Sequence, residues 1–523
     1  MTAAASTASA VSGAVESSAS VIQSVDWVAV APPTIVAVVG LAVLVTDLFL
    51  SERNKHLLGW ISLAGLTAAG LFLLPLTDSH RSTFCLSGPR ATACSYTVDE
   101  FTLVIQLLVI GGALLTALLS MTALKDARST DKELPEGEFW FLLLSSAAGA
   151  ALLPASRDLA TLVVALEVAS LPAFALVGLR RGDKRSSEAA LKFFLSSVTA
   201  TAVTLLGVSF VYAATGTMHL TELGEKLGNV DGQLDTLAQT GVVLTLVGFA
   251  FKVAAVPFHF WVPDTYVGAP LPVAAYLSVV GKAVGFTGLI LVTVVAFPEY
   301  ADVWGPALAA LAALTMTAGN VAALRQRATR AYSAVRLLAW SSVGQAGYLL
   351  VPIAAAGYAD QRSDVLEATG ATVAYALMYA AVNLGAFAVA ALVGRTQALN
   401  RVSDYRGLYA RSPLSALVLA FFLLCLAGLP PGIIGLFAKV TVFSAAVDAG
   451  LGWLAVVMAA NVVIALYYYL QWTALLFRAP QGEPVKHRVP APLTVAIAVT
   501  AVLGVALSGA PQLVLQFAEQ GVR

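Results

Sequence analysis

Apolar runs of about 20 residues recur along the whole chain, and a run of this length crosses the hydrocarbon core of a bilayer as a helix. Charged residues make up only 11% of the 523 residues, and the mean hydropathy is +0.83. Soluble domains carry roughly a quarter charged residues, so this chain has too few charges to cover a soluble surface of its size. The sequence therefore predicts an all-α polytopic membrane protein that forms a single bundle.

The spacing of the runs predicts about 14 transmembrane helices, an even number that places both termini on the same side. We expect these helices at residues 27–50, 57–76, 99–123, 138–155, 159–179, 189–214, 239–260, 270–297, 304–324, 333–357, 367–393, 414–448, 451–477 and 491–516. They form one bundle over 27–516. Residues 1–26 contain no Lys or Arg, so they lack the basic segment of a signal peptide and are expected to be a disordered outer tail. Residues 517–523 are expected to be a short C-terminal tail.

Lysine and arginine are unevenly distributed between the loops. Nineteen of them lie in one set of alternate loops, and six lie in the other loops and the termini. Because basic residues are retained on the cytoplasmic side, the rich set is expected inside and both termini outside. Loop 77–98 is then outside, where conditions are oxidising. Cys85 and Cys94 in that loop are nine residues apart and are expected to form a disulfide, whereas Cys425 lies within a span and should stay reduced.

Composition and motifs argue against several classes of protein. Lysine plus arginine equals aspartate plus glutamate, 30 each, so the charge gives no argument for nucleic-acid binding. The three cysteines form no C-x-x-C motif or Cys/His cluster, which argues against a metal or iron–sulfur site. No G-x-G-x-x-G motif opens a helix after a strand, so no dinucleotide site is expected. We therefore expect no cofactor in this chain.

Ionisable residues inside the predicted spans are the strongest functional signal. Five cations lie there, namely Lys192, Lys252, Lys282, Arg336 and Lys439. Among the acids, only Glu167 lies near the middle of a span. A charge at the bilayer centre costs at least roughly 2.5–3.5 kcal/mol, so such residues are functional candidates by default. The alternative for the two cations near helix ends, Lys192 and Arg336, is snorkelling to the interface; for the deeper ones it is a purely structural ion pair.

The deep lysines and the single glutamate have the chemistry of a proton relay. Removal from water lowers the pKa of a lysine and raises that of a glutamate, and an opposite charge reverses both effects. A Lys–Glu pair that can separate is therefore a protonation switch. Glu167 and Lys252 lie at similar depth on helices that run in the same direction, so a salt bridge between them is geometrically possible. His259 is a further candidate station, although a lone histidine is more often structural.

Two predicted spans, the seventh and the twelfth, contain internal breaks. Pro257 follows Lys252, and the pair Pro430–Pro431 precedes Lys439. Proline removes a helix hydrogen bond, which a membrane tolerates only where the freed backbone faces protein or water. The two spans run in opposite directions, and both carry the short match G-x-x-x-K-V. These features predict two inverted five-helix repeats, helices 4–8 over 137–297 and helices 9–13 over 304–477, with ion sites at the midplane.

Six segments resemble the antiporter-like subunits of respiratory complex I. The similar runs are LEVASLPAFALVGL around Glu167, SSEAALKFFLSS around Lys192, GFAFKVAAVPFHFWVPDTYVGAP, PVAAYLSVVGKAVGF, RLLAWSSVGQAGY and LAGLPPGIIGLFAKVTVF. The resemblance covers roughly residues 27–510. Within the family the chain is most similar to the N type, by its opening run DWVAVAPPTIVAVVGLAVLVTDLF, by lysine rather than glutamate at Lys439, and by its end after helix 14. Arg336 departs from the family pattern, in which lysine is common at this position.

The resemblance implies a proton-translocating membrane subunit of bacterial NADH-quinone oxidoreductase, in the plasma membrane. Glu167 would pair with Lys252 and control its pKa, Lys282 would be the central relay, reached from the inside partly through His259, and Lys439 would be the terminal station. Lys192 would be an accessory charge near Glu167. NADH, flavin, iron–sulfur clusters and quinone would be handled by partner subunits, and neighbouring antiporter-like subunits would flank this one.

Three alternatives stay open on the sequence. The first is a subunit of a multi-chain cation/proton antiporter, and the second is a membrane subunit of a hydrogenase-linked complex; both would use the same fold and lysines. The third is a structural membrane scaffold in which the buried ion pairs are inert.

Overall fold

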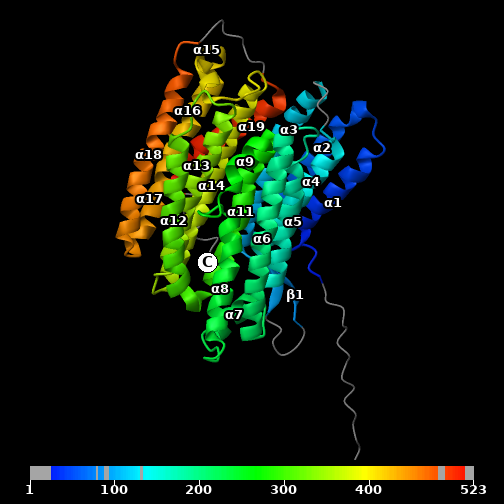
Figure 1. The fold of residues 1–523 in the computed structure, drawn as a ribbon. Helices are drawn as coiled ribbons and strands as arrows, with labels where there is room; N and C mark the ends of the chain where they lie inside the picture. The colour runs from blue at the N-terminus through cyan, green and yellow to red at the C-terminus, as the bar shows by residue number, and fades with distance from the viewer. Residues whose placement is uncertain (1–24, 78–79, 87–92, 130–133, 481–488, 513–523) are drawn as a thin grey trace, which may run out of the picture.

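The computed structural model describes residues 25–77, 80–86, 93–129, 134–480 and 489–512 as a bundle of helices that run roughly parallel to one another (Figure 1). The helices are α1 (Ala31–Asp47), α2 (His56–Leu71), α3 (Glu100–Ser129), α4 (Glu136–Leu152), α5 (Leu159–Val177), α6 (Lys184–Thr215), α7 (Leu220–Leu227), α8 (Asp235–Lys252), α9 (Trp261–Gly268), α10 (Leu271–Tyr276), α11 (Lys282–Ile290), α12 (Ala301–Leu324), α13 (Ser333–Ala356), α14 (Arg362–Gly394), α15 (Leu408–Arg411), α16 (Pro413–Ala427), α17 (Ile433–Asp448), α18 (Gly452–Leu476) and α19 (Ala491–Gly509). One hairpin, β1 (Arg81–Cys85) and β2 (Cys94–Val98), accompanies them.

Eleven helices in the described part of the chain are long and apolar enough to cross a membrane. This confirms the all-α polytopic class. The three predicted spans that fall outside these eleven correspond to the short helix α1, to α8 with the break that follows it, and to the divided pair α16 and α17. The number 14 therefore stays a prediction.

Loops of the two predicted sets gather at opposite ends of the bundle. At one end, Arg157 N–H donates to Ser95 O and Leu220 N–H donates to Arg157 O, which joins the hairpin, the α4–α5 loop and the start of α7. At the other end, Tyr332 N–H donates to Leu399 O. Figure 1 shows β1 and α7 at the lower end and α15 at the upper end. The alternation predicted from charge therefore agrees with the fold, whichever end faces the cytoplasm.

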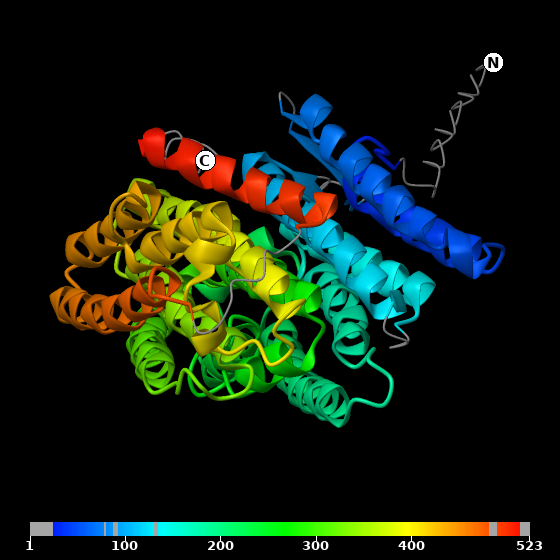
Figure 2. The same cartoon turned by 90° about the horizontal axis from the view of Figure 1, so that it is seen from above.

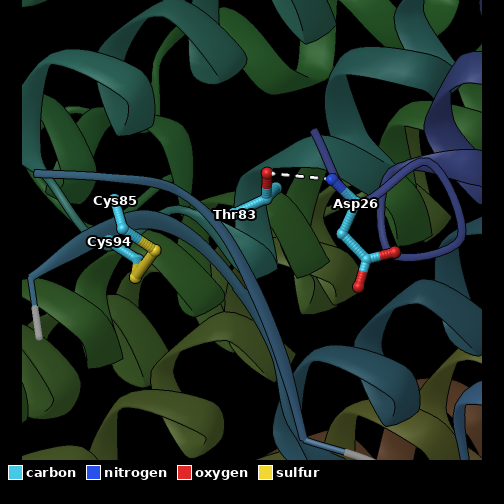
Figure 3. Close-up of a disulfide and its surroundings, with 4 residues drawn as sticks. All are labelled: Asp26, Thr83, Cys85 and Cys94. Atoms are coloured by element: carbon cyan, nitrogen blue, oxygen red, sulfur yellow. Dashed lines mark hydrogen bonds between the residues drawn. A yellow bond between two sulfur atoms is a disulfide. The ribbon is translucent and has the colours of Figure 1, made fainter. Parts of the chain in front are cut away.

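The hairpin is closed by a disulfide between Cys85 and Cys94, the two residues that the sequence paired (Figure 3). The start of the bundle is anchored to it, because Asp26 N–H donates to Thr83 Oγ1 at 3.2 Å and the Asp26 carboxylate lies 2.9 Å from Arg81 Nη1. Asp26 is thus held in place, although it was expected to end the disordered tail. Residues 1–24 of that tail, and the predicted tail 517–523, lie outside the described residues. Cys425 is buried and free.

Both predicted breaks are present as interruptions between two half-helices. The first half-helix pair is α8 and α9, separated by a segment in which Ala254 adopts a φ of 63°. The second is α16 and α17, where α16 ends at Gly428 with a φ of 83° and two prolines follow. Glycine suits such a left-handed cap because it has no Cβ to clash.

The predicted eighth span is also irregular, which the sequence did not indicate. A π-helical stretch, Leu277–Gly281, separates α10 from α11, and Lys282 is the first residue of α11. Such π-helical stretches are rare and often lie at functional sites.

Packing between helices brings backbones close at glycine. Gly207 on α6 faces Gly241 on α8, where a Cβ on Gly207 would lie 2.7 Å from the Gly241 carbonyl oxygen. This approach presses α8, which ends at Lys252, against α6. Seen from above, α19 lies along one flank of the bundle, where it packs against α3 and α14 (Figure 2). It thereby ties the first helices of the chain to the second half.

Candidate functional site

Glu167 and Lys252 form the ion pair that their depths allow. Glu167 Oε1, on α5, lies 3.8 Å from Lys252 Nζ, at the end of α8. Lys252 Nζ also donates to Ser170 Oγ at 2.7 Å and Ser197 Oγ at 2.8 Å. Thr201 Oγ1 on α6 donates to Glu167 Oε1 at 2.7 Å. The two charged groups are therefore close enough to interact, but each makes a shorter contact with a hydroxyl group than with the other charge. This arrangement suits an ion pair that can separate.

A small cavity adjoins Lys252. The volume open to the centre of a water molecule is about 30 Å³, which is room for about two waters. Polar groups at its wall include Ser170 Oγ and the pair Ser146 Oγ and Tyr276 Oη, which lie 2.9 Å apart. The wall also includes Gly281, the residue before Lys282. The cavity is thus a mostly apolar space with a few polar groups at its wall, and it extends from Lys252 towards α11.

Lys282 is 2% exposed, and the hydrogen bonds of its amine go to backbone carbonyls. Lys282 Nζ donates to Ser342 O on α13 at 2.7 Å and to Val253 O at 3.3 Å. Val253 caps the C-terminus of α8. Helix C-terminal carbonyls lack a helical donor and carry partial negative charge, so they are suitable partners for an ammonium group. The break in the seventh span therefore provides one of the two hydrogen-bond acceptors of Lys282, the more distant one.

His259 lies in the break itself. Its ring centroid is 5.5 Å from that of Trp340 on α13, two residues before Ser342. His259 Nδ1 is buried and has no hydrogen-bond partner among the described residues. His259 and Lys282 thus both lie against neighbouring turns of α13.

The polar face of α13 continues from Lys282 towards the second half. Tyr379 Oη donates to Ser342 Oγ at 3.0 Å, and Ser341 Oγ is hydrogen-bonded to Tyr469 Oη. Gln345 Nε2 donates to Tyr469 Oη and to Leu426 O, both at 3.4 Å. A cavity with about 20 Å³ for water centres, lined in part by Gln345 and Leu426, lies along this face. A line of polar groups thus connects the carbonyl that binds Lys282 with the C-terminal end of α16.

Lys439 meets that line at its far end. Its Nζ, on α17, donates to Ala427 O at 2.6 Å and Leu426 O at 2.9 Å, the last two residues of α16. It also lies 5.6 Å from the ring centroid of Tyr348, within cation–π range. Lys439 and Lys282 are thus both buried ammonium groups that donate to backbone carbonyls. Both acceptors of Lys439 lie at the end of α16, whereas Lys282 has one acceptor at the break, Val253 O, and a closer one within α13, Ser342 O.

Lys192 does not lie where it was expected. Its side chain is 48% exposed and pairs with Asp264 at 3.0 Å and Glu188 at 2.6 Å. Thr201, which contacts Glu167, is nine residues further along α6, about 13.5 Å at 1.5 Å per residue. Lys192 is thus no neighbour of Glu167. Depth along the chain already separated the two residues, because Lys192 lies near one end of its span and Glu167 near the middle; the expected proximity came from the family resemblance alone.

Several polar partners were missed from the sequence. Ser170 and Thr201 hold the ion pair, and Tyr469 joins Ser341 to Gln345. Ser170 lies three residues after Glu167, on the same helix face, which is a signal that could have found it. Asp264 was also missed, and it binds both Lys192 and Arg336. In the described part of the chain, no group of three or more His, Cys, Asp or Glu residues is arranged to hold a metal.

Comparisons with known proteins agree with this geometry. The family model described as NADH:quinone oxidoreductase/Mrp antiporter, TM, matches residues 156–465. The chain is 72% identical to NADH-quinone oxidoreductase subunit N 2 of Streptomyces griseus subsp. griseus, over 98% of this chain and 97% of the relative. It is similar to a chain of respiratory complex I from Thermus thermophilus, with 32% identity, a TM-score of 0.72, and coverage of 93% of this chain and 98% of that one. A chain of the Mrp complex from Dietzia sp. shares the fold, with 21% identity, a TM-score of 0.79, and coverage of 94% and 96%.

Proposed function

The chain belongs to the subunit N family of NADH-quinone oxidoreductase, and we propose that it translocates protons through a buried relay of one glutamate and three lysines. Glu167 and Lys252 are the switch, Lys282 is the central station and Lys439 the terminal one. His259 connects Lys282 with the inside, and Lys192 contributes from the inner end of α6.

The observation that supports this proposal is that the four residues lie along one series of polar groups, in which residues adjacent in sequence connect the steps that no hydrogen bond spans. Lys252 pairs with Glu167 at 3.8 Å, and the adjacent carbonyl, Val253 O, accepts from Lys282. The α13 face then leads through Gln345 to Leu426 O, which accepts from Lys439. Two small cavities, one beside Lys252 and one beside Gln345, have room for water, a carrier that proton transfer between lysines requires.

As a complex I subunit the chain works with other subunits. NADH oxidation, flavin and iron–sulfur chemistry and quinone reduction are assigned to partner subunits, and neighbouring antiporter-like subunits flank this one in the plasma membrane. The main alternative, a subunit of a multi-chain cation/proton antiporter, would use the same fold. Co-purification in mild detergent with subunits that carry flavin and iron–sulfur clusters supports the first assignment; their absence favours the second.

We further propose that two inverted five-helix repeats, over 137–297 and 304–477, build the relay. Each range contains one divided helix, α8/α9 in the first and α16/α17 in the second. In each, at least one carbonyl at the end of the first half-helix accepts a hydrogen bond from a buried lysine. Inverted repeats place ion sites near the midplane, where these lysines would then lie.

Both termini are proposed to face outwards. Residues 184 and 406 lie in the basic set of loops, and residue 226 lies in the other set. A cysteine introduced at 184 or 406 is expected to react with a membrane-impermeant maleimide only from the inside, and one at 226 only from the outside. The measurement uses intact cells and inverted vesicles, and the opposite labelling pattern would reverse the orientation.

The relay predicts that Lys282 cannot be replaced. In Lys282→Ala, the carbonyls of Val253 and Ser342 lose their ammonium donor and the central station disappears. We expect proton translocation to fall about tenfold or more, because a proton would have to cross an apolar gap of this length without a carrier. Proton uptake into vesicles, normalised to assembled complex, measures the loss. Lys125→Ala, at the exposed end of α3, is the matched control and should pump normally. Normal pumping in Lys282→Ala would exclude the relay.

A further inference from the structure

The half-helix α9 is held in place by three polar contacts to its surroundings. Trp261 Nε1 donates to Phe251 O across the break at 3.2 Å, and Tyr266 Oη lies 3.5 Å from Ser342 Oγ on α13. Between them on α9, Asp264 extends its carboxylate towards α6 and α13. The first two contacts lie inside the bundle, whereas Asp264 is 42% exposed.

Asp264 bridges two helices with its two oxygens. Oδ2 lies 3.0 Å from Lys192 Nζ on α6, and Oδ1 lies 3.5 Å from Arg336 Nη1 on α13. Glu188 on α6 shares Lys192 at 2.6 Å. The four side chains form a cluster of two acids and two bases, so removal of Asp264 leaves two cations facing one carboxylate.

The bridge lies beside the segments that carry the relay, although none of its members touches a relay lysine. Arg336 is four residues before Trp340, which packs against His259, and six before Ser342, whose carbonyl binds Lys282. Asp264 is five residues after His259 on the other side. The bridge therefore links the segment after the break to the part of α13 that contacts His259 and Lys282.

We propose that Asp264 is a positioning residue, which holds α9 between α6 and α13 so that the break keeps His259 and the Val253 carbonyl aligned on the path to Lys282. This inference rests on the proposed relay. The same bridge explains the arginine at 336. An arginine stays ionised in proteins and presents a planar set of N–H donors, so it is suited to be a permanent counter-ion and unsuited to pass protons on.

The first test is a set of variants in the assembled complex. Asp264→Asn is expected to lower the number of protons translocated per NADH oxidised. Arg336→Gln should lower this ratio less, because the pair between Asp264 and Lys192 remains. The double variant should be no worse than Asp264→Asn alone. Residues that act through one bridge are non-additive in this way. Asp264→Glu should restore most of the loss. The matched control is Asp126→Asn, which removes a similarly exposed carboxylate paired with Arg395 at the same end of the bundle.

The second test reports the position of α9 without any pumping. Val262 on α9 is 0% exposed, and cysteine has nearly its size. A Val262→Cys reporter should react with a maleimide roughly three- to tenfold faster in Asp264→Asn than in the parent, the range for loss of two partly exposed ion pairs. Native Cys425, buried at the other break, should stay unreactive in both and serves as the internal reference. Asp126→Asn should leave the reporter unchanged.

The outcomes separate the alternatives. Faster labelling together with reduced pumping, both reversed by Asp264→Glu, supports the positioning role. Reduced pumping with unchanged labelling overturns it, because Asp264 would then act on protons directly. Normal pumping in Asp264→Asn also overturns it. If Asp264→Asn does not assemble, Arg336→Gln and Lys192→Gln carry the same labelling test. If Lys282→Ala pumps normally, the relay fails, but the labelling still decides whether Asp264 holds α9.

Discussion

Glu167→Gln and Lys252→Ala are each expected to abolish most proton translocation while the complex still assembles. In Glu167→Gln, Lys252 keeps its hydroxyl partners Ser170 and Ser197 but loses its counter-charge. In Lys252→Ala, the buried carboxylate is left without a cation. An uncompensated buried charge costs roughly 3–5 kcal/mol unless the survivor becomes neutral, so each variant should hold the switch in one state. Proton translocation in reconstituted vesicles, normalised to assembled complex, measures the effect.

Conservative changes at the same pair distinguish charge from proton exchange. Glu167→Asp should do less harm, since the charge remains and only the reach to Lys252 and Thr201 is shortened. Lys252→Arg should fail almost as badly as alanine, because arginine cannot release its proton in this range. Glu52→Gln removes an exposed carboxylate that pairs with Lys55 and is the control for charge loss alone. Wild-type pumping in Lys252→Arg would mean that this position supplies charge only.

Lys439→Glu is expected to be more damaging than Lys439→Gln. The amine of Lys439 is held by the carbonyls of Leu426 and Ala427 at the C-terminal end of α16. A carboxylate placed there would face acceptors and the negative end of a helix dipole, whereas an amide can still donate. Both variants should lose pumping, and only Lys439→Glu should also reduce assembly, because a buried group left without its hydrogen bonds costs roughly 1–3 kcal/mol, more when it is charged. Immunodetection of the complex on native gels and pumping assays measure the two effects separately.

Lys226→Gln is the matched control for Lys439. Lys226 on α7 also donates to a backbone carbonyl, Thr215 O, but at the end of the bundle and on a short surface helix. It should assemble and pump like the parent. Equal assembly of Lys439→Glu and Lys439→Gln would show that the α16 carbonyls do not set the requirement for a cation.

The sequence predicted the helical class, the two breaks and the Glu167–Lys252 pair because these depend on depth. Apolar run length reports where a helix crosses the membrane, and proline reports where it is interrupted. The number of residues from the start of each helix then gives the depth of each side chain in the membrane, and for two parallel helices these depths can be compared. That reasoning showed that the ion pair, observed at 3.8 Å, was possible, and the family resemblance supplied the pairing itself.

Other features depend on which way a helix faces, and depth carries no such information. The partners that Lys192 faces are one such feature: they are Asp264 and Glu188. Asp264 follows the break in the seventh predicted span, so no apolar periodicity in the sequence showed which face of its helix it occupies. The π-helical stretch before Lys282 was missed for a related reason: its residues are as apolar as those of any other span, and the change is in the backbone hydrogen bonds.

The three buried lysines differ in what remains after a proton leaves. At Lys282 and Lys439 the partners are carbonyl dipoles, so each site is neutral when its lysine is deprotonated and positive when the lysine is protonated. At Lys252, with Glu167 ionised, the site is negative when the lysine is deprotonated and neutral when the lysine is protonated. In the proposed relay, a proton that moves from Lys252 to Lys282 would therefore separate charge across the break, and it would be drawn back until Glu167 is neutralised or moves away. The carboxylate thus opposes the first step, whereas transfer between Lys282 and Lys439 would connect two sites that each change from neutral to positive when they are protonated.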